Sequence, residues 1–187
     1  MVQLALRKRV LLLTGNPGVG KTTVLTKAVN ALKAKGFSVG GIISRELRAG
    51  GTRVGFEILD LNSDRRVWLA HINQKNGPQV GKYRVNTENL KFIGAKAIAD
   101  AVEKCDVIAI DEIGPMELFS EKFKEATRRA LKSRKPVLAL VHWKAKDRLI
   151  DEAKNREDQD TFTITHENRD KLPEAIAEKA VKFLNKA

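Results

Sequence analysis

The sequence VLLLTGNPGVGKT, residues 10–22, decides the fold of this chain. Residues 10–14 form a continuous apolar run rather than an alternation of apolar and polar residues. Such a run is typical of a strand covered on both faces in a parallel sheet. A helix is expected to follow, because apolar residues recur at helical spacing from Val24 to Leu32 and Gly36 can end it. Between strand and helix, residues 15–22 match G-x-x-x-x-G-K-[ST] at every fixed position, in the strand–loop–helix context that this phosphate-binding motif requires.

The motif predicts a loop that holds the phosphates of a nucleotide. Its glycines let backbone N–H groups turn toward phosphate oxygens, and the helix N-terminus adds partial positive charge. Lys21 would reach the β- and γ-phosphates, and Thr22 would offer a hydroxyl ligand to Mg²⁺. A glycine-rich turn that binds nothing is the alternative. The predicted phosphate-binding residues are Gly15, Asn16, Pro17, Gly18, Val19, Gly20, Lys21, Thr22 and Thr23.

A second apolar run, residues 107–110, ends in Asp111 and Glu112. In open α/β sheets, ligands bind at the carboxyl ends of the strands, so both acids are expected beside the phosphate loop. We predict that Asp111 holds Mg²⁺ through its water shell. Glu112 and Lys21 are the predicted catalytic residues: Glu112 orients the water that attacks the γ-phosphate, and Lys21 binds the phosphates. A polar strand end or a helix cap is the alternative. Residues 111–114 also fit the D-x-x-G of GTPase switches, but no N-K-x-D guanine signature follows.

Several other polar residues fall near the expected edge of the sheet. Glu117 could orient water, although an acid in the first turn of a helix is the simpler interpretation. His142 follows a predicted strand and could contact the γ-phosphate or cap the strand. Asn168 and Arg169 could contact the base or cap the final helix. Three arginines could contact the transferred phosphate or form surface ion pairs: Arg45, Arg48 and Arg53.

The remaining elements predict an α/β fold in one domain, residues 1–187. Strands are expected at 39–44, 107–110, 136–141 and 161–165, and helices at 87–103, 117–131, 145–153 and 172–185. Their alternation predicts right-handed crossovers and a mostly parallel sheet with helices on both faces. Residues 47–85 break the pattern. There, an alternating run at 54–58, a turn at 62–64 and a run at 67–69 predict an inserted β-hairpin, followed by a loop at 74–82.

The composition excludes several classes of protein. A chain of 187 residues can bury a core without disulfide or metal support, and one cysteine with three scattered histidines gives no zinc site. No apolar run approaches the roughly 20 residues that cross a bilayer, and residues 1–8 do not resemble a signal peptide, so a cytoplasmic protein is expected. The net charge of +12 is spread along the chain, which favours a solvated surface that attracts small polyanions over a dedicated nucleic-acid face.

Several motifs together resemble those of the small nucleoside-triphosphatases first known from thermophiles, a family with a cancer-related human relative. The motifs are residues 15–22, G-G-x-x-V-G-F at 50–56, V-G-K-Y at 80–83, D-E-I-G-P-M-E at 111–117, V-H at 141–142 and E-N-R-D at 167–170. The resemblance spans nearly the whole chain. It implies a RecA-like P-loop fold with an additional strand between the P-loop strand and the strand of Asp111. It also implies Mg²⁺-dependent hydrolysis of several nucleoside triphosphates with little base preference, with water activated by Glu112.

Three functions remain open, of which a monomeric hydrolase of ATP, GTP, CTP and UTP is favoured. A nucleotide or small-molecule kinase would share the P-loop, but it needs an acceptor site and usually an arginine-rich lid, where this chain has a hairpin. A nucleic-acid-stimulated ATPase is the third. Only the segment from Phe56 to Trp68 offers stacking aromatics, so only weak, non-specific nucleic-acid binding is expected.

Overall fold

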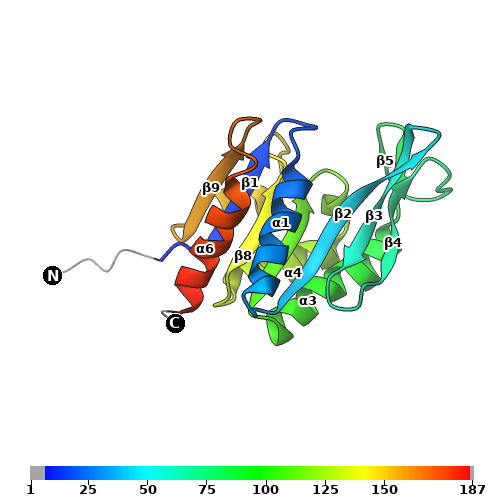
Figure 1. Ribbon diagram of the computed structural model, residues 1–187. Coiled ribbons are helices and arrows are strands. Elements are labelled where there is room, and N and C mark those ends of the chain that lie inside the picture. The colour runs from blue at the N-terminus through cyan, green and yellow to red at the C-terminus, as the bar shows by residue number, and fades with distance from the viewer. Residues whose placement is uncertain (1–6, 186–187) are drawn as a thin grey trace.

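The computed structural model describes residues 7–185, in which nine strands form one sheet (Figure 1). The strand order is β5-β6-β4-β3-β2-β7-β8-β1-β9. Five adjacent strands are parallel: β2 (Val39–Ala49), β7 (Val107–Ile113), β8 (Val137–Val141), β1 (Val10–Gly15) and β9 (Gln159–Ile164). Their carboxyl ends meet at the upper edge of the sheet in Figure 1. The predicted α/β class with a mostly parallel central sheet is confirmed, and β8 is the additional strand between β1 and β7.

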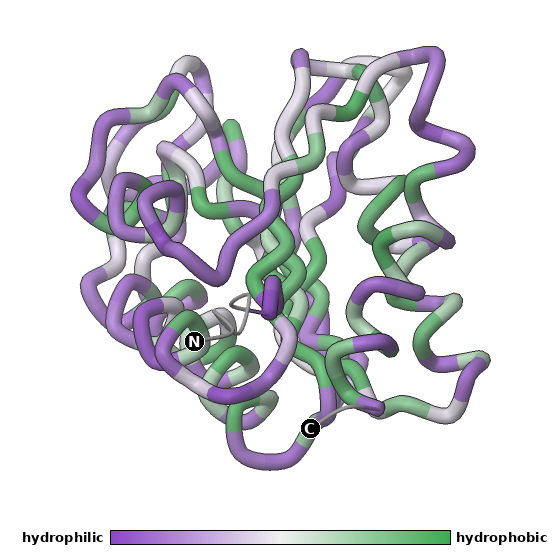
Figure 2. The backbone as a smooth tube through the Cα atoms, turned by 90° about the vertical axis from the view of Figure 1, so that its left-hand side faces the viewer, coloured by the Kyte–Doolittle hydropathy of each residue, from purple (hydrophilic) through white to green (hydrophobic). Residues whose placement is uncertain are grey.

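Helices cover both faces of the parallel strands. One face carries α1 (Lys21–Ala34) and α6 (Leu172–Leu184), and the other carries α3 (Ala95–Lys104), α4 (Glu121–Lys132) and α5 (Arg148–Lys154). Leu11 and Leu13 pack toward α1, whereas Leu12 packs toward the second layer. Figure 2 shows these apolar strands in the interior and hydrophilic loops outside them. Burial on both faces explains why these strands have continuous apolar runs.

The other four strands extend the sheet beyond β2 and are antiparallel: β3 (Thr52–Asp60), β4 (Arg66–His71), β5 (Gln79–Val80) and β6 (Tyr83–Val85). We call them the antiparallel extension. The predicted hairpin is present as β3 and β4. Two details of the prediction are wrong: β2 continues to Ala49 to pair with β3, and the predicted loop at 74–82 contains β5. The β2–β3 turn uses Gly50 and Gly51, at φ 55° and 78°, a conformation that glycine adopts without strain.

Helix starts differ from the predictions where a polar side chain caps the helix. The predicted helix at 117–131 is instead a 3₁₀ turn (Glu117–Phe119) followed by α4, because the Ser120 hydroxyl accepts a hydrogen bond from Phe123 N–H (3.2 Å). The helix predicted from residue 145 begins at Arg148, since Asp147 accepts from Leu149 N–H (2.8 Å). The predicted helix at 87–103 is continuous through α2 (Thr87–Asn89), a π-helical turn (Leu90–Gly94) and α3.

Two expectations on cellular location concern the N-terminus and membrane insertion. Positions 1–6 of the segment that we compared with signal peptides lie outside the described residues. Within residues 7–185, no helix combines the length and the apolar character that a bilayer crossing needs.

Candidate active site

The P-loop, residues 15–22, joins β1 to α1 at the carboxyl edge of the sheet. Gly18 and Gly20 have φ of 77° and 100°, and α1 begins directly after Gly20. The first N–H groups of a helix have no acceptor within the helix, so those of residues 21–23 are available to phosphate oxygens. The Lys21 ammonium donates to the carbonyl groups of Gly15 (3.1 Å) and Asn16 (3.2 Å), which holds it over the loop. The loop therefore presents aligned donors and one cation.

Asp111 ends the apolar part of β7 beside the start of α1, and its side chain is buried, with the residue 1% exposed. Burial raises the pKa of Asp111 to about 7, and the repulsion from Glu112 adds to this, while hydrogen bonds from Thr22 and Ser44 oppose it. Among the described residues, the Asp111 Oδ2 atom has no hydrogen-bond partner. A buried carboxylate oxygen without a partner, next to a hydroxyl, is the donor set that a hydrated Mg²⁺ takes. Thr22 and Asp111 therefore fit the predicted metal site.

Glu112 points into a cavity of about 410 Å³, which we call the first cavity. Lys21 and His142 also line it, and the positive charge of the Lys21 ammonium opposes the burial that raises the pKa of Glu112. Gly114 leaves room for the Glu112 side chain, because a Cβ atom there would lie 2.6 Å from Glu112 Oε1. The first cavity thus brings together a carboxylate, an ammonium and an imidazole.

His142 follows β8 and lines this cavity, because β8 lies between β7 and β1 in the sheet. Its backbone N–H donates to the Ile113 carbonyl (3.1 Å), which ties the ends of β8 and β7 together. Its Nδ1 atom is buried and has no hydrogen-bond partner within residues 7–185. A buried N–H without an acceptor costs about 1–3 kcal/mol, so the uncharged imidazole carries its hydrogen on Nε2. Of the two interpretations of His142, the structure favours contact with a ligand in the first cavity.

The three candidate arginines lie on β2 and β3. Arg48 and Arg53 both bind the Glu46 carboxylate (each 2.7 Å), and Arg53 also donates to the Tyr83 hydroxyl (3.0 Å). These two guanidinium groups are therefore held within the antiparallel extension. Arg45 is exposed, and none of the three lines a cavity described here.

Asn168 and Arg169 lie on the loop between β9 and α6, but their roles differ. The Asn168 amide is engaged within that loop, where it accepts from Thr165 N–H (2.8 Å) and donates to the Thr163 carbonyl (2.9 Å). Its side chain does not cap α6, which has no side-chain N-cap hydrogen bond. Arg169 instead lines a second cavity of about 220 Å³ at the start of α1, with Gly20 and Thr23. Of the two residues predicted to contact a base, only Arg169 lines this cavity.

Glu117, on the 3₁₀ turn after β7, is a third buried acid and is 5% exposed. Burial raises its pKa to about 8, and the charges of Glu112 and Asp111 raise it further, while hydrogen bonds from its own N–H and that of Gly114 oppose the shift. Glu117 is therefore largely protonated at pH 7. This favours Glu112 over Glu117 as the carboxylate that orients water.

A sequence profile of a family described as NTPase matches residues 10–177, which include every strand of the sheet. The chain belongs to this NTPase family. It is 45% identical over 167 residues to the nucleoside-triphosphatase THEP1 of Thermofilum pendens, covering 89% of this chain and 92% of that protein. The corresponding protein of Methanopyrus kandleri is 43% identical over 173 residues, with 92% and 95% covered. The resemblance that the sequence motifs indicated is confirmed.

Two solved structures are similar to this NTPase over most of its length. The crystal structure of THEP1 from the hyperthermophile Aquifex aeolicus gives a TM-score of 0.81 at 29% identity, covering 91% of this chain and 98% of that one. The solution structure of a human cancer-related nucleoside triphosphatase gives 0.76 at 35% identity, covering 91% and 96%. The position of the P-loop between β1 and α1 therefore belongs to a fold that this NTPase shares with relatives.

Sequence reasoning on this NTPase missed two residues that shape the site. Ser44 lies on β2 just beyond the residues that pair with β7 and hydrogen-bonds to Asp111, and Gly114 makes space for Glu112. Both had a signal in the sequence. Ser44 is a polar residue at the end of an apolar strand, and Gly114 follows the two acids at a fixed short distance.

The buried acids give this NTPase a testable dependence of stability on pH. The pKa of Glu117 is about 8 in the folded chain against an ordinary 4.5, so the folded state binds the proton more tightly. The free energy of unfolding therefore falls as pH rises from about 5 to 8, by a few kcal/mol. Glu117→Gln should flatten this fall, because a glutamine amide does not ionise. Urea unfolding of the nucleotide-free protein at pH 5, 6, 7 and 8 measures it, with the exposed Glu121→Gln as control. Parallel curves for wild type and Glu117→Gln would show that the Glu117 pKa is not raised.

Proposed function

We propose that this NTPase hydrolyses nucleoside triphosphates to diphosphate and inorganic phosphate, with Mg²⁺ as cofactor and little preference for the base. The observation that carries the proposal is the meeting of the P-loop, Lys21 and Glu112 around the first cavity. The names of the relatives, nucleoside-triphosphatase in each case, support the same reaction.

Each residue of the site has a role in this proposal. The N–H groups of residues 21–23 at the start of α1 hold the phosphate oxygens, and Lys21 binds the β- and γ-phosphates. Thr22 and Asp111 would hold Mg²⁺, which supplies positive charge against the phosphate oxygens when bound. Glu112 accepts a proton from the attacking water as the water oxygen bonds to the γ-phosphorus. The bond from that phosphorus to the β–γ bridging oxygen then breaks, leaving a nucleoside diphosphate.

His142 adds a donor to this arrangement. With its hydrogen on Nε2, the imidazole offers one N–H to the first cavity, where a γ-phosphate oxygen would accept it. Lys21 and His142 would thus bind the transferred group from two sides, while Glu112 faces the water. Nothing in this arrangement contacts the base, which agrees with a broad specificity.

The choice between hydrolysis and phosphoryl transfer to another acceptor is open to one assay. We expect ATP, GTP, CTP and UTP to release phosphate with kcat/KM values within roughly a factor of 30, or about 2 kcal/mol of discrimination. Release should require Mg²⁺ and stop with EDTA. The assay is phosphate release from each nucleotide, repeated with a panel of hydroxyl acceptors. A thousandfold preference for one base, or phosphate that appears on an acceptor in place of water, would contradict the proposal.

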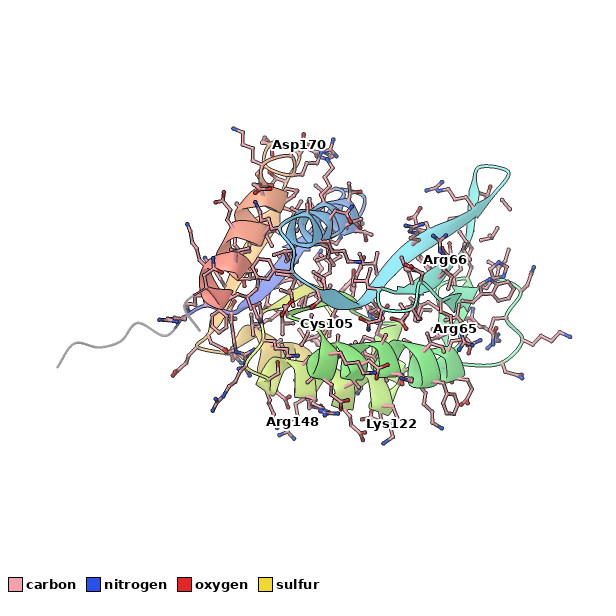
Figure 3. The ribbon with its side chains drawn as sticks, turned by 60° about the horizontal axis from the view of Figure 1, so that its bottom comes forward. Arg65, Arg66, Cys105, Lys122, Arg148 and Asp170 are labelled. Carbon is pink, nitrogen blue, oxygen red and sulfur yellow. The ribbon has the colours of Figure 1, made fainter. Side chains whose placement is uncertain are left out.

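A role in nucleic-acid binding has less support. The aromatic rings of the antiparallel extension are engaged with other side chains: Trp68 stacks on His71 with ring centres 4.1 Å apart, and Arg53 lies over both the Phe56 and the Tyr83 ring. The basic residues labelled in Figure 3 lie on separate elements, with Arg65 and Arg66 at the antiparallel extension and Lys122 and Arg148 at α4 and α5. We therefore propose only weak, salt-dependent binding to nucleic acids.

We also propose that the enzyme acts as a cytoplasmic monomer. The single Cys105 is buried and free, which fits a reducing compartment. The site is built from one chain, since the P-loop, Asp111 and Glu112 all come from the same sheet. Sedimentation of the purified protein with and without nucleotide would test the oligomeric state.

A further inference from the structure

The second cavity shares no lining residue with the first cavity, which contains Glu112. The first cavity is lined by Asn16 and Lys21 from the P-loop, whereas Gly20 and Thr23 line the second. A triphosphate that places its γ-phosphate beside Lys21 and Glu112 must direct its α-phosphate and nucleoside away from them, toward the helix side of the loop. On the proposed function, the second cavity is therefore where the nucleoside emerges.

The side chain of Arg169 covers this end of the loop. Its Nη1 atom donates to the Val19 carbonyl (3.4 Å), and its Cδ and Nη1 atoms each lie 3.9 Å from where a Cβ atom on Gly20 would be. The guanidinium group is thus held against the junction of loop and helix. Figure 3 shows the neighbouring Asp170 on the same loop, beside α1.

The other groups around this cavity are poorly suited to identify a base. Lys27 and Asp170 are exposed and face each other at 3.8 Å, Thr23 is assigned to the phosphates, and Val24 and Gly20 offer no side-chain hydrogen bond. A site that selects a base needs fixed donors and acceptors for the base edge, because an unpaired polar group then penalises the wrong base. The planar guanidinium of Arg169 differs, since it can stack on the face of any base, and every base has such a face.

We propose that Arg169 is the residue that holds the base, by stacking its guanidinium plane on the ring face, and that this contact is the reason for low base selectivity. The proposal rests on the proposed function, because it takes the γ-phosphate position from it. Arg169 then contributes affinity equally to purine and pyrimidine nucleotides. It contributes nothing to a ligand that has phosphates but no nucleoside.

Inorganic tripolyphosphate has the phosphates of a nucleotide but no nucleoside, so its binding distinguishes a phosphate contact from a base contact. Binding of tripolyphosphate and of non-hydrolysable analogues of ATP, GTP, CTP and UTP is measured by calorimetry on the full chain with Mg²⁺. We expect Arg169→Ala to weaken all four nucleotides about 5- to 100-fold, the range for loss of one stacking contact. Tripolyphosphate should bind within twofold of wild type.

Two more variants distinguish the effect of the planar shape of the Arg169 guanidinium from the effect of its charge. Arg169→Gln keeps a planar amide without charge, and Arg169→Lys keeps a charge without a plane. We expect Arg169→Gln to retain more nucleotide affinity than Arg169→Lys. Lys171→Ala, a matched control that removes an exposed cation from the same loop outside the cavity, should change no affinity by more than twofold. Thermal unfolding of each variant checks the fold, which should survive because Arg169 makes a single long hydrogen bond.

The opposite outcomes overturn the inference. If tripolyphosphate weakens in parallel with the nucleotides, Arg169 is a phosphate contact. If the loss is confined to one or two bases, Arg169 reads the base edge. If no affinity changes, the nucleoside lies elsewhere. Failure of the proposed function itself would look different, because wild type would then bind neither tripolyphosphate nor nucleotide in a manner that depends on Lys21.

Discussion

Glu112→Gln is expected to bind nucleoside triphosphates within a few-fold of wild type and to lose a factor of about 10²–10⁴ in kcat, the range for loss of a positioned general base. The substitution keeps the size of the side chain and removes the charge that the attacking water needs. Lys21, Thr22 and the P-loop N–H groups stay in place, so binding and chemistry should separate. Phosphate release and binding of a non-hydrolysable analogue measure the two effects.

Variants of the neighbouring acids make this result specific. Asp111→Asn should also raise the Mg²⁺ concentration needed for activity, because Asp111 belongs to the proposed metal site. Glu117→Gln should keep most activity, since a protonated Glu117 does not act as a base at pH 7. The exposed Glu125→Gln serves as the surface control. Normal turnover by Glu112→Gln with an inactive Glu117→Gln would assign the water to Glu117, and activity in both would exclude a carboxylate-oriented water.

Lys21→Ala is expected to abolish turnover and to weaken nucleotide binding about 30- to several thousand-fold. Truncation of one partner in a hydrogen-bonded charge pair at a binding site costs about 2–5 kcal/mol, which gives this range. The fold should be kept, because the ammonium contacts only two carbonyl groups of an exposed loop. Calorimetry, phosphate release and thermal unfolding are measured together.

Lys33→Ala, exposed in the last turn of the same helix, provides the matched control and should behave as wild type. Tripolyphosphate binding should fall with nucleotide binding in Lys21→Ala, which distinguishes this variant from Arg169→Ala. Hydrolysis of ATP at the wild-type rate by Lys21→Ala would show that the P-loop is not the active site.

The parts of the site that follow directly from a buried strand were predictable. Residues 10–14 and 107–110 are long apolar runs, and a parallel strand buried on both faces is what such a run forms. The motif after the first run and the acids after the second then lie at one edge of the sheet for geometric reasons. His142 follows another apolar run, residues 136–141, and was expected at the same edge, whereas the position of an additional strand between the first two followed only from the family resemblance.

Local hydrogen bonds explain most of what the sequence did not reveal. Ser120 and Asp147 interrupt helices that apolar spacing alone continues, and both are residue types that cap helix starts. The Asn168 side chain hydrogen-bonds to the backbone of its own segment, and the spacing of apolar residues does not predict such bonds. β2 continues to Ala49 because residues 45–49 pair with β3. These five residues are exposed or half-buried, so their hydrophobicity does not predict a strand.

The position of β1 in the sheet also orders the assembly of the molecule. Val10 pairs with Val137 on one side and with Gln159 on the other. Both neighbours of β1 are therefore strands more than 120 residues further along the chain. By contrast, β2, β3 and β4 pair with near neighbours in sequence and can form early, because closing short loops costs less entropy. During synthesis the P-loop therefore emerges first but gains its neighbouring strands last. A ligand that binds the folded P-loop stabilises the chain only after β1 has gained its neighbouring strands, so nucleotide binding favours the completed sheet over its early parts.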